Sequence, residues 1–303
     1  MPELPEVETI ARQLQSKIAG KTILGIEVLD KKVIDENIAN ILPSRIVDVS
    51  RRGKSIIIQL EQKNNLLAHL RMTGHFYHIA NQDRSYIANQ DRSYIANQDR
   101  SYIANQDRSY IANQDRSYIA NRDKSYKKYL SGIFKLNNGS FFTFNEIRRF
   151  GSVKLFTNEQ LNRELSKLGP EPLSIKDVEF AALLKNYPSS VIKTKLLDQT
   201  CLAGIGNIYA QEMLYHAGIN PLKKIRDISE AKLALLHQEM QRILRLAIQN
   251  NGATADNYSH LAGRGNFQNF LAVYGQERCP KKHQLAKIKM GGRGTSYCKV
   301  CQE

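Results

Sequence analysis

Apolar residues recur at two spacings along the chain, and each spacing predicts a different kind of element. Residues 5–19 open with a prolyl turn and then place apolar side chains at helical spacing, namely Val7, Ile10, Leu14 and Ile18. Glycine readily adopts the left-handed conformation that ends helices, so Gly20 is the expected end of this helix. β-Branched runs separated by turns follow at 23–28, 46–49, 56–60 and 66–70. These short runs predict an antiparallel sheet.

Residues 130–156 return to the short-run pattern, with Asn138 and Gly139 as a hairpin signal between two strands. Beyond residue 170 the spacing becomes helical. Two capping-box patterns, Ser174 with Asp177 and Asp227 with Glu230, each precede apolar residues at helical spacing. The second helix is expected to bury one face, made of Leu233, Leu236, Met240, Ile243 and Ala247. The chain is therefore rich in strands first and in helices second.

A tandem repeat interrupts the strand-rich region. Residues 79–118 are five perfect copies of the octapeptide IANQDRSY, and residues 119–126 are a sixth, altered copy. The period of eight matches no common solenoid, and each perfect unit is electrically neutral, with only Ile, Ala and Tyr to bury. We interpret residues 79–126 as a polar, flexible loop between two strands, where long insertions cost little loop-closure entropy. A stacked structure built on the Ile and Tyr positions is the alternative.

The composition narrows the class of protein. The chain has 303 residues, 42% of them hydrophobic, and no apolar run approaches the roughly 20 residues of a membrane helix. Its acidic N-terminus lacks the apolar segment of a secretory signal, which predicts a cytoplasmic protein. Lys and Arg total 44 against 29 Asp and Glu, a net charge of +15 that attracts polyanions. Ribosomal, tRNA-binding and membrane-surface proteins share this balance, so charge alone does not choose the partner.

Three of the four cysteines lie within a 23-residue segment near the C-terminus. Cys279 and His283 form one pair, and after fourteen residues Cys298 and Cys301 form a second. Tetrahedral zinc takes four ligands from two such pairs on turns, so the spacing predicts one structural zinc ion. The surrounding basic residues suit this hairpin to phosphates; they are Lys281, Lys282, Lys287, Lys289, Arg293 and Lys299. Cys201 stands apart and is expected to be a small buried apolar residue.

A glycine-rich turn precedes a second helix of interest. Gly204 and Gly206 lead into Asn207, the expected N-cap of a helix that continues to about His216. Glycine at such a turn lets a phosphate approach the first N–H groups of the helix. A purely structural corner explains so short a motif about equally well.

The N-terminus offers a nucleophile. After removal of Met1, Pro2 would present a secondary α-amine, and because α-amines titrate near pH 8, a useful fraction is neutral at physiological pH. Such an amine can attack an aldehydic sugar carbon and form an iminium. Glu3 and Glu6 are neighbouring carboxylates able to carry protons. Taken alone, Pro2 and Pro5 are more simply explained as residues that stiffen the entry to a helix.

Considered together, the motifs resemble those of the formamidopyrimidine-DNA glycosylase family, in that family's order and over nearly the whole chain except the repeats. They are PELPEVET at 2–9, RRGK at 51–54, HLRMTG at 69–74, RRFG at 148–151, LDQ at 197–199, GIGNIYA at 204–210 and GRGT at 292–295. The resemblance implies that Pro2 is the Schiff-base nucleophile attacking C1′ of the damaged nucleotide, and that Glu3 is the proton donor that opens the sugar. It further implies that Lys54 serves β-elimination and holds a phosphate. Arg293 would assist δ-elimination and grip the phosphate beside the lesion.

The resemblance also implies contacts with DNA. His69, Lys193 and Asn207 would contact the backbone. Met72, Arg148 and Phe150 would fill the void left by the everted lesion, since chemistry on a base in a duplex requires its eversion. Core packing is the alternative interpretation of Met72 and Phe150. Glu6 and the loop from Thr254 to Tyr258 would line the base pocket.

Three positions depart from the family pattern. The family's zinc finger usually has four cysteines, whereas here Lys282 holds the place of the second, with His283 one residue on. The strand after the repeats has Tyr129 where a DNA-contacting histidine is expected. Residues 250–258 match the family's lesion-recognition loop only loosely, which leaves the substrate preference open.

The sequence therefore predicts an α+β multidomain protein. An antiparallel β-sandwich with an N-terminal helix would span residues 1–170, a helix–two-turn–helix domain 171–264, and a zinc-finger β-hairpin domain 265–303. The expected protein is a monomer in a bacterial cytoplasm, associated with the nucleoid and not with membranes. Its partner would be double-stranded DNA carrying oxidised bases or abasic sites, and its cofactor one zinc ion. It would remove 8-oxoguanine and formamidopyrimidines and cut the strand by β,δ-elimination.

Two alternatives differ in function. An endonuclease VIII-like enzyme of the same fold would act on oxidised pyrimidines, but Leu4 and residues 7–9 favour the purine branch. A non-catalytic nucleic-acid-binding zinc protein would use the same hairpin. The combination of Pro2, Glu3 and Lys54 speaks against it, because binding alone does not need that set.

Overall fold

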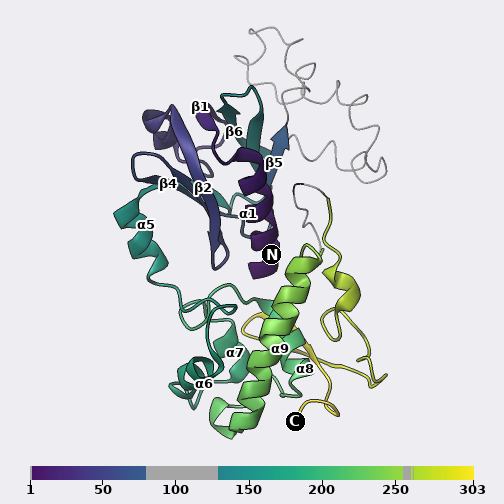
Figure 1. Cartoon of the computed structure of the whole chain (residues 1–303). Helices are drawn as coiled ribbons and strands as arrows, with labels where there is room; N and C mark the ends of the chain where they lie inside the picture. The colour runs from purple at the N-terminus through teal and green to yellow at the C-terminus, as the bar shows by residue number, and fades with distance from the viewer. Residues whose placement is uncertain (1, 80–128, 255–260, 262) are drawn as a thin grey trace. The chain divides into compact units, whose positions relative to one another are not determined.

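The computed structural model of the chain describes residues 2–79, 129–254, 261 and 263–303 (Figure 1). The contacts within it form two compact units. The helical unit comprises residues 1–9, 51–56 and 159–303, and the sheet unit comprises residues 10–50 and 57–158. The repeat region, from residue 80 onward, lies outside the described residues. Across the described part of the chain, no helix is long and apolar enough to cross a membrane.

Among the described residues, the sheet unit contains strands of one eight-stranded sheet, a short 3-10 helix, η1 (Glu36–Ile41), and the second half of the N-terminal helix. The strands are β1 (Thr22–Val28), β2 (Ser44–Arg52), β3 (Ser55–Leu60), β4 (Asn64–His69), β5 (Gly74–Ile79), β6 (Leu130–Leu136), β7 (Phe141–Glu146) and β8 (Ser152–Thr157). They are hydrogen-bonded in the order β5-β7-β6-β1-β2-β3-β4-β8. The hairpin predicted at Asn138 and Gly139 joins β6 to β7, and Gly139 has a φ of 78°.

The two ends of this strand order lie beside each other. β4 and β8 stand at one end and β5 and β7 at the other. Residues 70–73 alone join β4 to β5, and residues 147–151 alone join β7 to β8. Connections this short span less than about 20 Å, so the sheet must fold back on itself into two layers. The antiparallel β-sandwich predicted for the N-terminal half is confirmed.

Helix α1 (Leu4–Ile18) supplies apolar side chains to both units. Ile10, Leu14 and Ile18 are buried in the sheet unit, and Leu4 packs into the core of the helical unit. The helix predicted from the apolar spacing is therefore confirmed. Gly20, with a φ of 76°, follows it in the left-handed conformation that its position required.

The helical unit carries most of the helices. They are α5 (Asn158–Leu165), α6 (Asp177–Lys185), α7 (Ile192–Leu196), α8 (Asn207–His216) and α9 (Glu230–Gln249), with the 3-10 helices η6 (Ile225–Asp227) and η7 (Phe267–Phe270). The apolar face predicted for the longest helix is buried from Leu233 to Ala247, which packs α9 against α6 and α8. Cys201 is buried in the same core, as predicted.

The predicted capping boxes are wrong by two residues. The N-cap of α9 is Ser229, whose hydroxyl accepts from Lys232 N–H, and the N-cap of α6 is Lys176. The residues expected to cap lie instead in turns closed by their own backbone bonds. Ser174 N–H donates to Glu171 O at 3.1 Å, and Asp227 N–H donates to Lys224 O at 3.0 Å.

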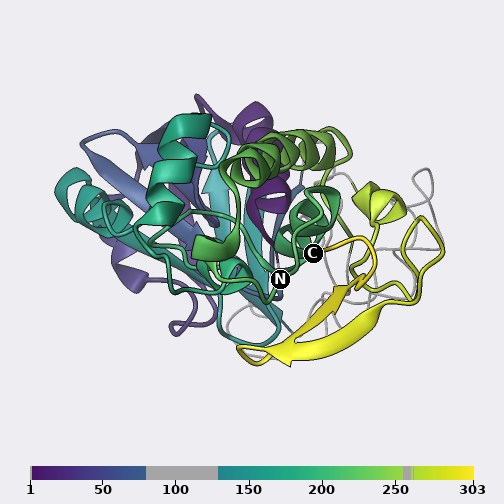
Figure 2. The ribbon, with the colours of Figure 1, turned by 90° about the horizontal axis from the view of Figure 1, so that it is seen from below.

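A two-stranded hairpin, β9 (Ala286–Met290) and β10 (Arg293–Tyr297), ends the chain. Gly291 and Gly292 form its turn with φ values of 53° and 76°, the left-handed pair that a tight type I′ turn requires. Figure 2 shows this hairpin, in yellow, as a separate ribbon at the edge of the helical unit. The C-terminal hairpin predicted from the sequence is confirmed.

Candidate active site and metal centre

Hydrogen bonds fix the N-terminal residues within the helical unit. Pro2 and Glu3 are buried. Glu3 N–H donates to Glu6 Oε2 at 2.8 Å, and Leu4 N–H donates to Gly204 O at 3.0 Å. These hydrogen bonds therefore hold in place the backbone of the segment that begins with Pro2, the predicted nucleophile.

The Glu3 carboxylate occupies the N-terminus of α8. Its Oε1 accepts from Ile208 N–H at 2.9 Å, and its Oε2 accepts from Tyr209 N–H at 3.4 Å. The first N–H groups of a helix favour a negative charge, so this is a good place for a carboxylate. The sequence suggested a phosphate at these N–H groups. The structure shows Glu3 there instead.

The two glycines before α8 are required by close approach. A Cβ at Gly206 would overlap the Glu3 carboxylate, and one at Gly204 would lie 2.9 Å from Leu4 Cβ. Gly204 also has a φ of 88°, which side chains rarely adopt. Gly206 is the N-cap and Asn207 the first helical residue, so the prediction of Asn207 as N-cap was wrong by one position. The glycine motif serves to bring Glu3 to the helix.

Three basic side chains share the electrostatic environment of Glu3. Lys54 is buried, and burial lowers the pKa of its amine, with Arg293 also lowering it and Glu3 and Glu6 opposing. Burial, then the charge of Arg293, lowers the pKa of Lys193 to about 8, and Glu3 opposes. These effects place Lys54 and Lys193 within electrostatic reach of Glu3, and Arg293 within electrostatic reach of both lysines. The structure thus brings together the predicted catalytic residues Glu3, Lys54 and Arg293.

A partly buried carboxylate organises the turn that carries Lys54. Glu171 accepts from Gly53 N–H at 2.7 Å, from Arg51 at 2.7 and 3.1 Å, and from Arg52 at 2.9 Å. Arg51 also donates to Glu8 Oε2 of α1 at 2.8 Å. Sequence analysis missed Glu171, because nothing local marks a carboxylate whose partners lie about 120 positions away. This network fixes the backbone on which Lys54 stands.

Lys193 and Asn207 bond to each other and to the hairpin. Lys193 Nζ donates to Asn207 Oδ1 at 2.8 Å and to Thr295 Oγ1 at 2.6 Å. Asn207 Nδ2 donates to Gly294 O at 3.1 Å. Lys193 is buried, at 1% exposed. Its predicted contact with DNA backbone, and that of Asn207, stay predictions.

The predicted base-pocket residues lie close to the loop after α9. Glu6 Oε1 accepts from Tyr209 Oη at 2.5 Å and from Ala253 N–H at 2.8 Å. Burial raises the pKa of Glu6 to about 6, with the charge of Glu3 adding to the effect. Thr254 donates its hydroxyl to Gly265 O at 3.0 Å. Tyr258, the third pocket residue, lies outside the described residues.

In the sheet unit, the three residues expected to fill the void of an everted base lie together. Arg148 Nη1 donates to Met72 Sδ at 3.0 Å, and its guanidinium lies 5.0 Å from the centre of the Phe150 ring. Met72 is 43% exposed and Phe150 59% exposed. Both are large apolar side chains in solvent, which rules out the alternative of core packing. We call these three residues the exposed triad.

Glu146 organises the backbone beneath the exposed triad. This buried carboxylate accepts from Thr73 Oγ1, from Arg148 N–H at 2.9 Å and from Gly151 N–H at 2.9 Å. A Cβ at Gly151 would overlap it, so the glycine of the RRFG motif is required there. His69, at the end of β4, accepts from Arg71 N–H at its Nδ1. Glu146, like Glu171, was not foreseen from the sequence.

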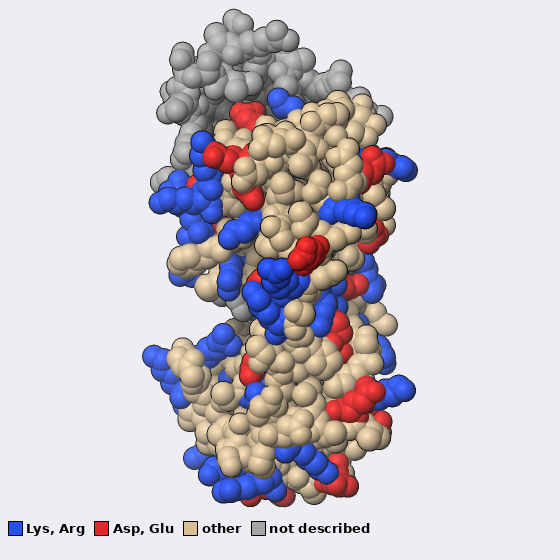
Figure 3. Space-filling view, turned by 90° about the vertical axis from the view of Figure 1, so that its left-hand side faces the viewer, with Lys and Arg blue, Asp and Glu red and all other residues tan. Residues whose placement is uncertain are grey.

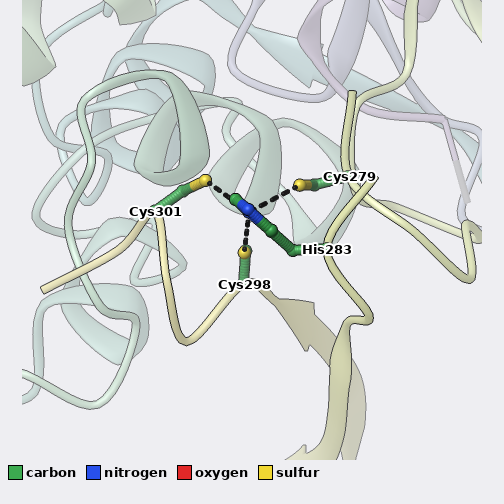
Figure 4. A group of neighbouring side chains, drawn as sticks. All are labelled: Cys279, His283, Cys298 and Cys301. Carbon is green, nitrogen blue, oxygen red and sulfur yellow. Dashed lines mark hydrogen bonds between the residues drawn. The ribbon is translucent and has the colours of Figure 1, made fainter. Parts of the chain in front are cut away.

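The C-terminal pairs converge into one cluster that could hold a metal ion (Figure 4). His283 Nδ1 lies 3.7 Å from Cys279 Sγ, 3.6 Å from Cys298 Sγ and 3.4 Å from Cys301 Sγ. Tetrahedral zinc, with bonds of about 2.0 Å to nitrogen and about 2.3 Å to sulfur, separates such ligands by about 3.5 Å. The donor set therefore fits one zinc-sized ion.

His283 lies one residue after Lys282, the position where the resemblance implies a second cysteine, and its Nδ1 joins the cluster. Lys282 is exposed and has a φ of 66°, and its N–H closes a turn on Cys279 O at 2.7 Å. The turn directs the next side chain, His283, into the cluster. Tyr215, Val273 and Leu285 pack around it and keep Cys279 and Cys298 buried. With this departure from the family pattern, the cluster still offers four side chains that could bind a metal ion.

The antiparallel sandwich, the helical unit and the Cys/His hairpin define a multidomain α+β protein, and comparison with known families identifies its class. Residues 1–153 match the family model of the formamidopyrimidine-DNA glycosylase N-terminal domain, and residues 168–259 match its H2TH domain. The chain belongs to the formamidopyrimidine-DNA glycosylase family. The domain boundaries predicted at 170/171 and 264/265 stay predictions.

Individual relatives agree with this assignment. A formamidopyrimidine-DNA glycosylase of Pelotomaculum thermopropionicum is 34% identical over 100% of this chain and 99% of its own length. One from Streptococcus pyogenes is 33% identical with the same coverage. Among solved structures, Lactococcus lactis Fpg in complex with abasic-site DNA matches with a TM-score of 0.79 at 30% identity, covering 99% of both chains. The wild-type enzyme with N7-benzyl-Fapy-dG DNA matches over 100% of both chains, also at 0.79.

Proposed function

We propose that the chain is a bifunctional DNA glycosylase and AP lyase of base excision repair that removes oxidised purines. The observation that carries this proposal is the gathering of Glu3, Lys54 and Arg293 in one electrostatic environment at the N-terminal segment that begins with Pro2. Relatives named formamidopyrimidine-DNA glycosylase, and solved complexes of Lactococcus lactis Fpg with abasic and Fapy-dG DNA, support it.

The first step is base removal by the N-terminal amine. Once Met1 is cleaved off, the Pro2 nitrogen attacks C1′ while the bond from C1′ to the base breaks. The nitrogen loses its proton as the iminium forms. The Glu3 carboxylate, held in place by two N–H groups of α8, accepts this proton and delivers it to the ring oxygen as the sugar opens. Fixed geometry at Glu3 is what this transfer needs.

The second step is strand cleavage. The iminium acidifies the C2′ hydrogen, and removing it breaks the bond from C3′ to oxygen. Lys54 suits this role because burial lowers the pKa of its amine and so increases the fraction able to accept a proton. A second elimination removes the C4′ hydrogen and breaks the bond from C5′ to oxygen, so that the phosphate on that oxygen leaves with the electron pair. The Arg293 guanidinium would stabilise the departing phosphate.

Zinc is the metal we propose for the cluster of Cys279, His283, Cys298 and Cys301. When bound there, it would serve as a structural staple. Holding the ends of β9 and β10 keeps Arg293 on a rigid strand, which is the hairpin's contribution to the reaction.

Double-stranded DNA is the proposed partner. Figure 3 shows many Lys and Arg side chains at the surface, with acidic side chains among them. His69, Lys193 and Asn207 would contact phosphates, and the exposed triad would fill the space of an everted base. Glu6, Thr254 and Tyr258 would line the pocket for that base. A DNA partner in a bacterial cell implies a cytoplasmic, nucleoid-associated location.

A lesion panel tests the proposal. Duplexes carrying 8-oxoguanine, a formamidopyrimidine or thymine glycol would be incubated with the purified enzyme, and base release and strand cleavage would be measured separately. We expect release of both purine lesions and β,δ-elimination products. Preferential release of thymine glycol would favour the endonuclease VIII-like alternative, and tight binding without any base release would favour the non-catalytic one.

A further inference from the structure

The outer edge of β10 carries backbone groups that no strand satisfies, because the hairpin sheet has only two strands in the described part of the chain. Residues of an antiparallel strand point their N–H and C=O groups alternately to one neighbour and the other. Arg293 pairs with Met290 across the turn, so the backbone groups of Gly294 and Ser296 face the outer edge.

The side-chain amide of Gln211 meets this edge. Gln211 lies on α8 and is buried, at 2% exposed. Its Oε1 accepts from Ser296 N–H at 2.6 Å, and its Nε2 donates to Gly294 O at 3.3 Å and to Asn207 O at 2.8 Å. One carboxamide thus bonds to β10 as a neighbouring strand would.

A second anchor fixes which face of β10 turns toward the helices. Side chains alternate along a strand, so Arg293 and Thr295 project from the same face. Thr295 Oγ1 accepts from Lys193 Nζ at 2.6 Å, which turns that face toward α7. The electrostatic effect of Arg293 on both Lys193 and Lys54 agrees with this orientation.

The metal cluster fixes only the far end of the strand. Cys298 directly follows Tyr297, the last residue of β10, whereas Arg293 is the first. Near Arg293 the strand is also held by the bonds from Lys193 to Thr295 and from Asn207 to Gly294, but of these three side chains only Gln211 bonds to the backbone of both Gly294 and Ser296. Without Gln211, the outer edge of β10 would lose its bond at Ser296, and Arg293 would be held less firmly. We propose that Gln211 is a positioning residue for Arg293, and so controls the δ-elimination step. This inference rests on the role of Arg293 in the proposed function.

The test separates the two eliminations on an abasic-site duplex under single-turnover conditions. Gln211→Met removes both bonds to β10 at nearly constant side-chain volume. Because a displacement of about 1 Å can cost about 100-fold, we expect the ratio of δ- to β-elimination product to fall at least tenfold. Borohydride trapping at Pro2 and a zinc content of one per chain should be retained. Gln238→Met, an exposed residue of α9, is the matched control and should leave the ratio unchanged.

Two results would overturn the inference, and they are distinguishable. If Arg293→Ala lowers the ratio but Gln211→Met does not, then Arg293 acts as proposed and Gln211 does not position it. If Arg293→Ala itself leaves the ratio unchanged, the proposed role of Arg293 is wrong and the inference falls with it. Should Gln211→Met lose zinc, Gln211→Asn repeats the measurement with an amide that is one methylene too short to reach both partners. An unchanged ratio in that zinc-loaded variant also overturns the inference.

Discussion

At the scale of single residues, buried and partly buried carboxylates hold the site together. Glu3, Glu6, Glu146 and Glu171 each accept two or more hydrogen bonds from groups far away in the sequence or across a turn. A buried charge is costly unless it is paired, so each position requires its whole set of donors. Glu3 and Glu6 were singled out in the sequence because they lie beside Pro2. Glu146 and Glu171 do not stand out there, because a glutamate that organises a turn looks like any surface glutamate.

The contribution of Glu6 to the free energy of unfolding is expected to depend on pH. Burial raises its pKa from 4.5 to about 6, so the folded protein binds the proton more tightly than the unfolded chain does. Its contribution to the free energy of unfolding is therefore present at low pH and is lost as the pH rises from about 4.5 through about 6. The difference in pKa corresponds to about 2 kcal/mol.

Urea denaturation of wild type and Glu6→Gln, over a series of pH values, measures this contribution. The free energy of unfolding of wild type, relative to the variant, should increase by about 2 kcal/mol between about pH 7 and about pH 4. Protonation of other groups, including the Cys/His cluster, affects both proteins and cancels in the difference. If the free energies of unfolding of the two proteins change with pH in the same way, burial does not raise the pKa of Glu6 in the folded protein.

At the scale of elements, patterns that depend on near neighbours were predictable. The apolar faces of α1 and α9, the Asn138-Gly139 hairpin and the ligand spacing around Cys279 all rest on residues close in sequence. The predicted N-caps of α6 and α9 were wrong because the turn before a helix determines where the helix begins. Asp227 belongs to η6, so α9 begins at Glu230. The sequence also did not show why residue 206 is a glycine. The Glu3 carboxylate, for which a side chain at 206 would leave no room, is about 200 positions away.

One prediction at this scale concerns the metal ion proposed for the C-terminal hairpin. Elemental analysis should find one zinc ion per chain, and chelation should release DNA while the sheet unit stays folded, because metal binding and local folding are coupled. His283→Cys should keep the zinc, since thiolate and imidazole both suit it, and His283→Ala should lose it. Cys201→Ser is the control, as Cys201 lies in the core and not in the cluster. Less than about a tenth of an equivalent of any metal in wild type would refute the site.

At the scale of the whole molecule, the repeats are the largest feature without an assigned role. Their neutral composition predicts that about 48 residues cannot bury enough surface to offset an ordering cost of roughly 1–2 kcal/mol each. They connect β5 to β6, two strands that are separated by β7 alone. Adjacent strands lie about 4.8 Å apart, so a far shorter connection would suffice.

Excision of residues 79–118 tests the passive role of the repeats. In the shortened chain Ile119 takes the place of Ile79 at the end of β5. We expect glycosylase activity close to wild type and a melting temperature within about 2 °C of it. Unfolding, or loss of DNA binding, would show that the repeats are a structural element and not a passive expansion.

The central claim is that the Pro2 amine forms the covalent bond to the sugar. Borohydride reduces the iminium and should link wild-type protein to an abasic-site duplex, with the DNA mapped to the N-terminal peptide. Pro2→Gly should greatly weaken the adduct, and a form that retains Met1 should give none, because its Pro2 nitrogen is an amide. Undiminished trapping by the Met1-retaining form would contradict the account, since the nucleophile would then lie elsewhere in the chain.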